Sequence, residues 1–320
     1  MLPATPAIAA AVATPLDLDR LLREAADLAR ASRSKATWRA YASDWRDFTA
    51  WCALAGLDPL PATPVTVGLY LADQAATRSI ATLTRRVSAI SVQHRLAAYH
   101  LDTRHPAIAA VLAGLRRSKD VAPRQATALT VPLAKRAVAT CADRLIDIRD
   151  RALILVGLAG GFRRSELVLL DVADVTVSED GLRILVRRSK ADQDGEGEIV
   201  GVNRTGSATC PVAAYVTWLG EAGIGEGRVF RSVSRHGRVG ASLSDRAVTL
   251  IVQSRADRAG LDAGFSGHSL RAGFATSAAA AGVDERTIMR TTRHRSATVL
   301  RRYIRDGALF NRNVTSEIGL

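Results

Sequence analysis

The chain has 320 residues, of which 44 are Lys or Arg and 31 are Asp or Glu, so its formal charge at pH 7 is +13. This length is enough for about two domains, each with a core of its own. The excess of positive charge favours a polyanion as partner. Nucleic acid fits better than a membrane surface, because no apolar run approaches the roughly 18 residues of a transmembrane helix.

The sequence lacks the signatures of common metal and cofactor sites. Its three cysteines, Cys52, Cys141 and Cys210, lie far apart and form no C-x-x-C pair, which argues against zinc and against a disulfide framework. There is no Walker loop and no carboxylate cluster of metal-site type, so we expect chemistry without cofactor or metal. Residues 1–15 are rich in Pro and Ala and lack the basic start of a signal peptide, which predicts a flexible tail on a cytoplasmic protein.

A helical hydrophobic period runs through residues 16–118 and predicts a compact bundle of four or five helices. Ser34, Thr63 and Ser79 each stand in the position of a helix cap, and Pro64 suits a first helical residue. The helix from Ser34 has an apolar stripe at helical spacing, formed by Trp38, Tyr41, Trp45, Phe48 and Cys52.

The polar faces of these helices are basic. Such a face is often merely solvated, but in a strongly basic chain it favours contact with DNA. Cationic side chains would then position the domain on phosphates, while polar ones read base edges. The predicted DNA-binding residues are Lys35, Arg39 and Arg46 on the helix from Ser34, and Arg85, Arg86, Ser88 and Gln93 on the helix from Ser79.

The period is lost at residues 119–130, which we expect to link the bundle to a second domain at residues 131–320. The helical pattern that follows ends at two glycines, which permit a sharp turn. Arg163 should therefore project from the start of the next helix. Glu166 lies one turn along the same face, where its carboxylate can hold the guanidinium of Arg163.

Alternating hydrophobicity then predicts a small three-stranded antiparallel sheet, with strands at residues 175–177, 182–186 and 198–202. The turn between the second and third strands carries Lys190. It is either a solvated charge or a group that reaches back over a site. Lysine occurs at only four positions in the chain, and unlike Arg it can give up a proton.

From Cys210 to the end the pattern is helical again. His268-Ser-Leu-Arg271 opens one helix, where an imidazole and a guanidinium can address one anion. A short helix between His294 and Tyr303 would fold Tyr303 back to the same point. Each residue alone has an ordinary structural explanation, but two histidines, an arginine and a phenol around one anion indicate phosphoryl transfer with a tyrosine nucleophile.

These motifs resemble, in order, those of the tyrosine recombinase (phage integrase) family, from about residue 34 to the end. Gly161-Phe-Arg163-Arg-Ser-Glu166-Leu is similar to the family's first arginine motif, and His268-Ser-Leu-Arg271 to its His-x-x-Arg box. The remaining matches are Ser189-Lys190 with the hairpin lysine, His294 with the second histidine, and Tyr303 with the nucleophile.

Two positions depart from the family's usual pattern. The chain has Gly-Phe-Arg163 where the family often has Gly-Leu-Arg, and Arg293-His294 where it often has Gly-His. Neither departure removes a chemical group.

The resemblance implies a mainly α fold with two domains, a SAM-like core-binding bundle at 16–118 and an α+β catalytic domain at 131–320. It implies a site-specific recombinase in which Tyr303 forms a 3′-phosphotyrosyl bond with DNA. Arg163 and Arg271 would grip the phosphate oxygens and His294 would donate to them. His268 would act as base or donor near Tyr303, and Lys190 would protonate the leaving oxygen.

The implied partners are double-stranded DNA with an inverted-repeat site and three further copies of the chain, as a tetramer on two duplexes. The segment 304–320 would dock into a neighbouring subunit through Phe310, Val314 and Ile318. A type IB topoisomerase and a non-enzymatic DNA-binding protein on the same fold are the alternatives. The helical domain, the tail after Tyr303 and the full set of six site residues favour the recombinase.

Overall fold

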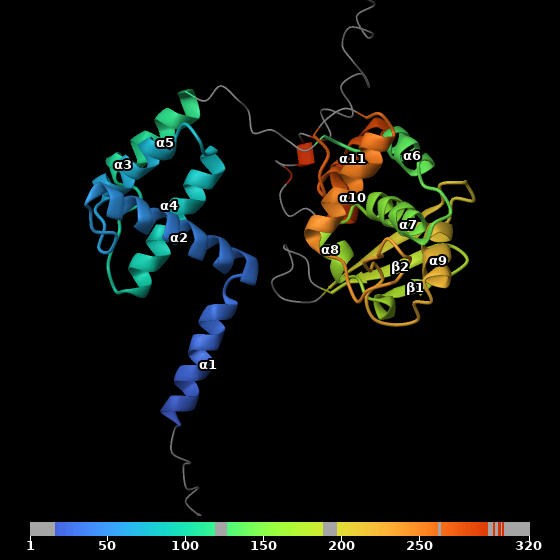
Figure 1. Ribbon diagram of the computed structural model, residues 1–320, viewed down its shortest axis with the longest axis horizontal. Coiled ribbons are helices and arrows are strands. Elements are labelled where there is room, and N and C mark those ends of the chain that lie inside the picture. The colour runs from blue at the N-terminus through green and yellow to red at the C-terminus, as the bar shows by residue number, and fades with distance from the viewer. Residues whose placement is uncertain are drawn as a thin grey trace, which may run out of the picture. The chain divides into compact units, whose positions relative to one another are not determined.

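A computed structural model describes residues 17–118, 127–187, 197–261 and 264–293, and four residues of the last segment, Ala297, Leu300, Arg301 and Tyr303. Several predictions fall outside the described residues: the tail at 1–15, most of the linker, Lys190, His294 and the docking segment at 304–320. The chain divides into two compact units, Met1–Pro123 and Arg124–Leu320 (Figure 1). The predicted architecture, mainly helical with one small sheet, is confirmed.

Unit 1 is helical. Its elements are α1 (Leu18–Ala31), α2 (Lys35–Ala55), α3 (Pro64–Gln74), α4 (Ile80–Leu96) and α5 (Pro106–Ser118). The predicted caps are confirmed, because the hydroxyls of Ser34, Thr63 and Ser79 each accept a hydrogen bond from the backbone N–H three residues on. Local sequence therefore sets where α2, α3 and α4 begin.

The apolar stripe of α2 forms the centre of the unit 1 core. Phe48 and Cys52 are fully buried, and Phe48 packs edge-on against Tyr70 of α3 with ring centroids 5.1 Å apart. By contrast, α1 buries no residue and extends away from the bundle (Figure 1). One contact that holds it is the hydrogen bond from the indole N–H of Trp38 to the carbonyl of Arg30, at 2.8 Å.

Unit 2 places helices around the sheet. Its elements are α6 (Val131–Ala139), α7 (Leu145–Ala159), α8 (Arg164–Leu169), a 3-10 turn η1 (Val172–Asp174), β1 (Val175–Val177), β2 (Gly181–Val186), β3 (Glu198–Asn203), α9 (Pro211–Glu221), α10 (Asp245–Arg258), α11 (Ser269–Ala280) and α12 (Glu285–Thr292). The sheet is antiparallel in the order β1-β2-β3, with Val175 opposite Ile184 and Leu182 opposite Val202. The three predicted strands are confirmed to within one residue at each end.

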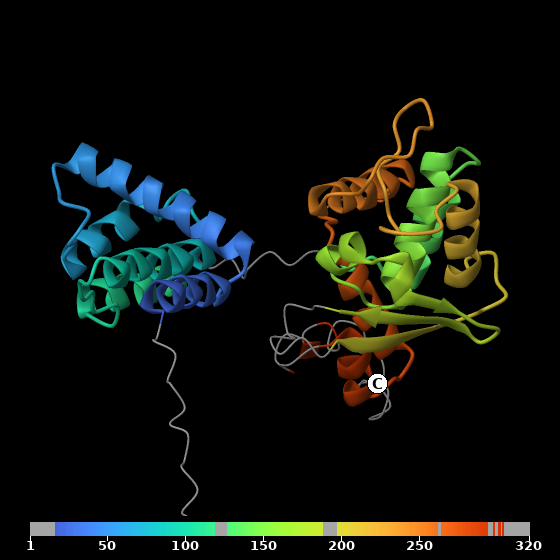
Figure 2. The ribbon, with the colours of Figure 1, turned by 90° about the horizontal axis from the view of Figure 1, so that it is seen from below.

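The core of unit 2 joins the inner face of the sheet to α7 and α9 (Figure 2). Ile184 of β2 and Trp218 of α9 are fully buried, and the indole N–H of Trp218 donates to the carbonyl of Val229 at 2.8 Å. Leu129, placed by the sequence in the linker, is fully buried in this core, and its N–H donates to the carbonyl of Ser269. Leu129, which precedes α6, therefore already belongs to unit 2.

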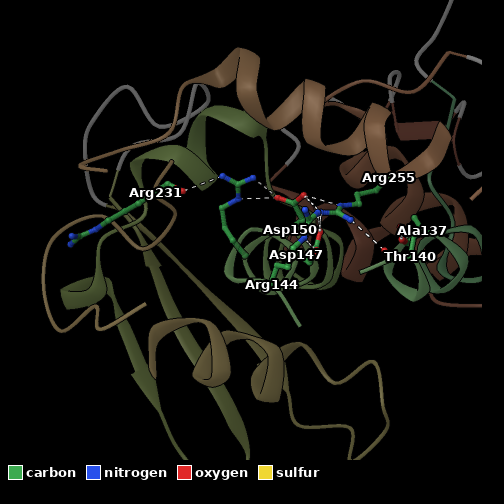
Figure 3. Close-up of polar contacts among 8 residues, drawn as sticks. Ala137, Thr140, Arg144, Asp147, Asp150, Arg231 and Arg255 are labelled. Carbon is green, nitrogen blue, oxygen red and sulfur yellow. Dashed lines mark hydrogen bonds and ion pairs between the residues drawn. The ribbon is translucent and has the colours of Figure 1, made fainter. Parts of the chain in front are cut away.

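A charge cluster of Arg144, Asp147, Arg149, Asp150 and Arg255 ties α7 to α10 (Figure 3). Arg255 is 3% exposed. Its Nε and Nη2 donate to Oδ2 of Asp150 at 2.8 and 2.6 Å, and Nη2 also donates to Asp147. Arg144 pairs with Asp147 from the solvent side, at 2.9 Å. No local pattern in the sequence predicts this cluster, because Arg255 lies 105 residues from Asp150.

Within the described residues, no helix combines the length and the apolar character needed to cross a bilayer.

Candidate active site

The turn between α7 and α8 presents Arg163. Gly161 has φ of +55°, and a Cβ there would lie 3.0 Å from Cγ2 of Thr292 and 3.2 Å from the ring of Phe274. Glycine is therefore needed both for the backbone conformation and for the close approach of α11 and α12. The chain leaves this turn at Arg163, the residue that precedes α8, as the sequence predicted.

Glu166 holds Arg163 from one turn along α8. Nη1 of Arg163 donates to Oε1 of Glu166 at 2.5 Å, and the backbone N–H of Arg163 donates to Oε2 at 2.8 Å. The predicted contact is confirmed. Burial by itself raises the pKa of Glu166, but the charge of Arg293 and the hydrogen bonds from Arg163 outweigh it and hold the pKa below its usual value.

Arg271 reaches the same turn from the first turn of α11. Its side chain is 1% exposed, and Nη1 donates to the carbonyl of Gly161 at 2.9 Å. Burial and the positive charge of Arg163 lower the pKa of Arg271 to about 9, although Glu166 acts in the opposite direction. The protein thus holds this guanidinium at an electrostatic cost that a bound anion would relieve.

His268 stands at the N-terminal end of α11 and keeps access to solvent. Its ring centroid lies 6.3 Å from that of Tyr303, with 50° between the ring planes. Surrounding protein atoms, and then the charges of Arg271 and Arg163, lower the pKa of His268. The imidazole is therefore neutral near pH 7 and able to accept a proton.

Tyr303 is 6% exposed and packs against α11 and α12. Its apolar neighbours form a cluster of buried residues: Ala272, Ala275, Ala279, Ile288 and Leu300. The described residues of this last segment are helical, and Nε of Arg301 pairs with Glu285 at the start of α12, at 3.1 Å. The structure thus brings Tyr303 beside His268, as the spacing predicted.

A further arginine, Arg293, contacts this site, and the sequence analysis gave it no role. It follows α12 directly, and its Nη2 donates to Oε2 of Glu166 at 2.6 Å. The signal in the sequence was its departure from the usual glycine.

The structure brings together five of the predicted site residues: Arg163, Glu166, His268, Arg271 and Tyr303. Lys190 and His294 lie outside the described residues. No group of three His, Cys, Asp or Glu that could hold a metal ion occurs in the part of the chain that the structure describes.

Comparison with known proteins identifies the family. Residues 128–308 match the phage integrase family. The chain belongs to this family. It is 39% identical over 302 residues to an integrase/recombinase xerD homolog of Selenomonas ruminantium, an alignment that covers 90% of this chain and 87% of that protein. It is also 26% identical over 309 residues to the recombinase cre of Escherichia phage P1, covering 91% and 88%.

Solved structures share the fold of this integrase family member. The Tn1549 transposon integrase in complex with transposon right end DNA matches with a TM-score of 0.62 at 14% identity, covering 89% of this chain and 92% of that one. A lambda integrase dimer bound to a COC' core site matches with a TM-score of 0.59 at 15% identity, covering 93% and 78%. At these identities the likeness concerns the fold alone.

The predicted DNA-binding residues of unit 1 fall into two groups. Lys35, Arg39 and Arg46 are exposed along α2, and so are Arg85 and Ser88 on α4, while Gln93 is partly buried. Arg85 also donates to both carboxylate oxygens of Asp44, at 2.8 and 3.0 Å. These side chains are therefore placed where a polyanion can meet them.

Arg86 is different and needs a correction. It is 5% exposed, and its guanidinium donates to Asp47 at 2.8 Å and to the hydroxyl of Tyr70 at 2.6 Å. A phosphate could reach this group only by breaking those buried contacts. Arg86 therefore belongs to the core between α2, α3 and α4. The prediction failed because the partners of Arg86 lie on α2 and α3, and the hydrophobic period of α4 does not show how those helices pack against it.

Proposed function

We propose that this phage integrase family member is a site-specific DNA recombinase that cleaves and rejoins strands through a covalent bond between Tyr303 and a DNA 3′-phosphate. The observation that carries the proposal is the grouping of the guanidiniums of Arg163 and Arg271 with the imidazole of His268 and the phenol of Tyr303. Names of the matching relatives, integrase/recombinase and recombinase, support the same activity and favour neither of the alternatives.

In the cleavage step, the phenol oxygen of Tyr303 forms a bond with the scissile phosphorus while the bond from phosphorus to the 5′ oxygen breaks. The phenol proton passes to His268, whose lowered pKa leaves it neutral and ready to accept. The 5′ oxygen leaves as a hydroxyl after taking a proton. We assign Lys190 as its donor because Ser189-Lys190 resembles the family's hairpin lysine, and because an arginine of ordinary pKa could not release a proton.

Arg163 and Arg271 supply the charge that this step needs. As phosphorus becomes five-coordinate, negative charge grows on its two non-bridging oxygens. Arg271 is held buried beside the positive charge of Arg163, so a phosphate placed between the two guanidiniums would be attracted by both. His294 would add a hydrogen bond to the same oxygens.

The reverse step completes strand exchange. A 5′ hydroxyl from a partner duplex attacks the phosphotyrosyl bond, and Tyr303 leaves with the proton returned by His268. The number of phosphoester bonds stays constant, so the reaction needs no nucleotide as an energy source.

DNA and further copies of the chain are the proposed partners. The exposed cations of α2 and α4 would contact the phosphates of an inverted-repeat site, and four copies would assemble on two duplexes. Phe310, Val314 and Ile318 would dock the tail of each copy into its neighbour. We propose that such an assembly acts in the cytoplasm.

A suicide substrate tests the proposal. On a duplex nicked close to the scissile phosphate, the wild-type chain should leave an adduct that resists SDS, and Tyr303→Phe should bind the same DNA without forming one. The control is Tyr99→Phe, which changes an exposed tyrosine of unit 1 and should cleave as wild type. An adduct formed by Tyr303→Phe would refute the assignment.

A further inference from the structure

Arg293 has a backbone conformation that disfavours every residue with a side chain. Its φ is +56° and its ψ is +47°, in the left-handed region that favours glycine. Among the residues that the structure describes, Ala98 is the one other non-glycine residue with positive φ. The strain at residue 293 must therefore be offset by what its side chain contacts.

The side chain of Arg293 turns inward and is 1% exposed. Nη2 donates to Oε2 of Glu166 at 2.6 Å, and Nη1 donates to the carbonyls of Thr291 at 2.8 Å and Gly160 at 3.3 Å. The guanidinium carbon lies 5.0 Å from the centroid of the Phe162 ring, within the range of a cation–π contact. The two positions that depart from the family's motifs, Phe162 and Arg293, thus touch each other.

Arg293 also contacts Arg163 through its backbone. Nη2 of Arg163 donates to the carbonyl of Arg293 at 3.1 Å, while Nη1 of Arg163 donates to Oε1 of Glu166. Glu166 therefore binds one guanidinium on each carboxylate oxygen, that of Arg163 on Oε1 and that of Arg293 on Oε2. Both groups that hold the guanidinium of Arg163, the Glu166 carboxylate and the Arg293 carbonyl, are themselves fixed by the Arg293 side chain.

We propose that Arg293 is a positioning residue for strand cleavage, clamping the turn from Gly160 to Arg163 onto the end of α12. The clamp orients the guanidinium of Arg163 toward the phosphate and fixes the point at which the chain leaves α12 toward Tyr303. This inference depends on the proposed function, because it assigns Arg293 a part in that reaction. Without the Arg293 side chain, Glu166 would pair with Arg163 alone, whose side chain is 19% exposed, and residue 293 would be free to leave the left-handed region.

A purely structural role for a buried arginine predicts something different. Loss of a structural contact lowers the stability of unit 2. It would slow cleavage by the same factor whether residue 163 is Arg or Lys. A positioning role acts through Arg163, so its effect on the rate should vanish once the side chain being positioned has been changed.

The test compares Arg293→Met, Arg163→Lys and the double variant in the full chain. The measurement is the single-turnover rate of covalent adduct formation on the suicide substrate. The protein concentration is kept above the dissociation constant of each variant for that DNA. Arg163→Lys keeps a charge but cannot reproduce the two-sided hydrogen bonding of a guanidinium. We expect Arg293→Met to slow cleavage on the order of 10- to 100-fold, as for a displaced catalytic group, with DNA binding little changed. The double variant should then be no slower than Arg163→Lys alone.

Two further variants complete the design. Arg293→Lys should recover part of the rate, because an ammonium can still pair with Glu166, and it serves also if Arg293→Met does not fold. Arg290→Met, which removes an exposed charge from the same helix, should cleave at the wild-type rate. Wild-type cleavage by Arg293→Met, or a double variant slowed by the product of the two single effects, would overturn the inference. Failure of the wild-type chain to form any adduct would instead overturn the proposed function.

Discussion

Arg255→Met tests whether the charge cluster carries the stability of unit 2. The change removes a side chain that is 3% exposed and that donates to two carboxylates, those of Asp147 and Asp150, whose side chains are 2% and 6% exposed. Removing one partner of a buried ion pair costs about 3–5 kcal/mol, because a charge is left buried without its counterion. Each carboxylate keeps one other arginine, so we expect the lower end, about 3 kcal/mol.

Arg144→Met is the matched control. Arg144 pairs with the same Asp147, but its side chain is 67% exposed. Solvent screens such a pair, and its loss should change stability little. The two variants thus remove one arginine each from the same carboxylate and differ in burial.

Hydrogen–deuterium exchange of the full chain, read peptide by peptide, is the assay. At about 3 kcal/mol, protection of the most stable amides of α7 and α10 should fall about a hundredfold in Arg255→Met and only slightly in Arg144→Met. Peptides from α2 and α4 in unit 1 are the internal control and should keep their protection. Equal losses in both variants, or none in Arg255→Met, would show that burial does not set the stabilisation by this cluster.

Three further predictions concern pH, the leaving group and assembly. Burial alone would raise the pKa of Asp147, but hydrogen bonds from Arg144 and Arg255 leave it lowered, as the pKa of Glu166 is lowered by its arginines. The stability that both carboxylates contribute is therefore present above their unfolded pKa values of about 4, and it is lost as the pH falls through their lower folded pKa values. Thermal melts recorded from pH 7 to pH 3 measure this loss. Lys190→Ala should regain cleavage on a substrate whose 5′ leaving oxygen is replaced by sulfur, since a thiolate leaves without a proton, whereas Arg163→Ala should not; equal rescue of both would contradict the division of roles. Deleting residues 309–320 should preserve binding to a single half-site and abolish a complex of two duplexes in native gels, and normal recombination by the deletion would rule out docking by the tail.

Local signals explain the parts of the fold that the sequence predicted. A cap such as Ser34 or Thr63 acts within three residues, and a period of 3.6 identifies the buried stripe of α2 without knowledge of what covers it. The Gly161 turn and the contact between Arg163 and Glu166 are local in the same sense. These elements could be predicted because their stabilising contacts lie close together in the chain.

Contacts between distant segments could not be predicted in this way. Arg255 meets Asp150 across 105 residues, and Arg86 meets Asp47 across 39, so neither pairing appears in any local pattern. Arg293 was visible as an unusual residue before His294. Only the fold shows that its side chain turns toward Glu166, 127 residues earlier in the chain.

Mapping the covalent adduct would identify the residue that attacks the DNA. After cleavage of a labelled suicide substrate, protease digestion and mass spectrometry identify the residue that carries the nucleotide, and end-labelling identifies the chemistry of the released strand. We expect a 3′-phosphate joined to the tryptic peptide of residues 303–305, with a free 5′ hydroxyl on the other fragment. Attachment at another residue, a 5′-phosphate linkage, or cleavage without any protein–DNA bond would contradict this expectation.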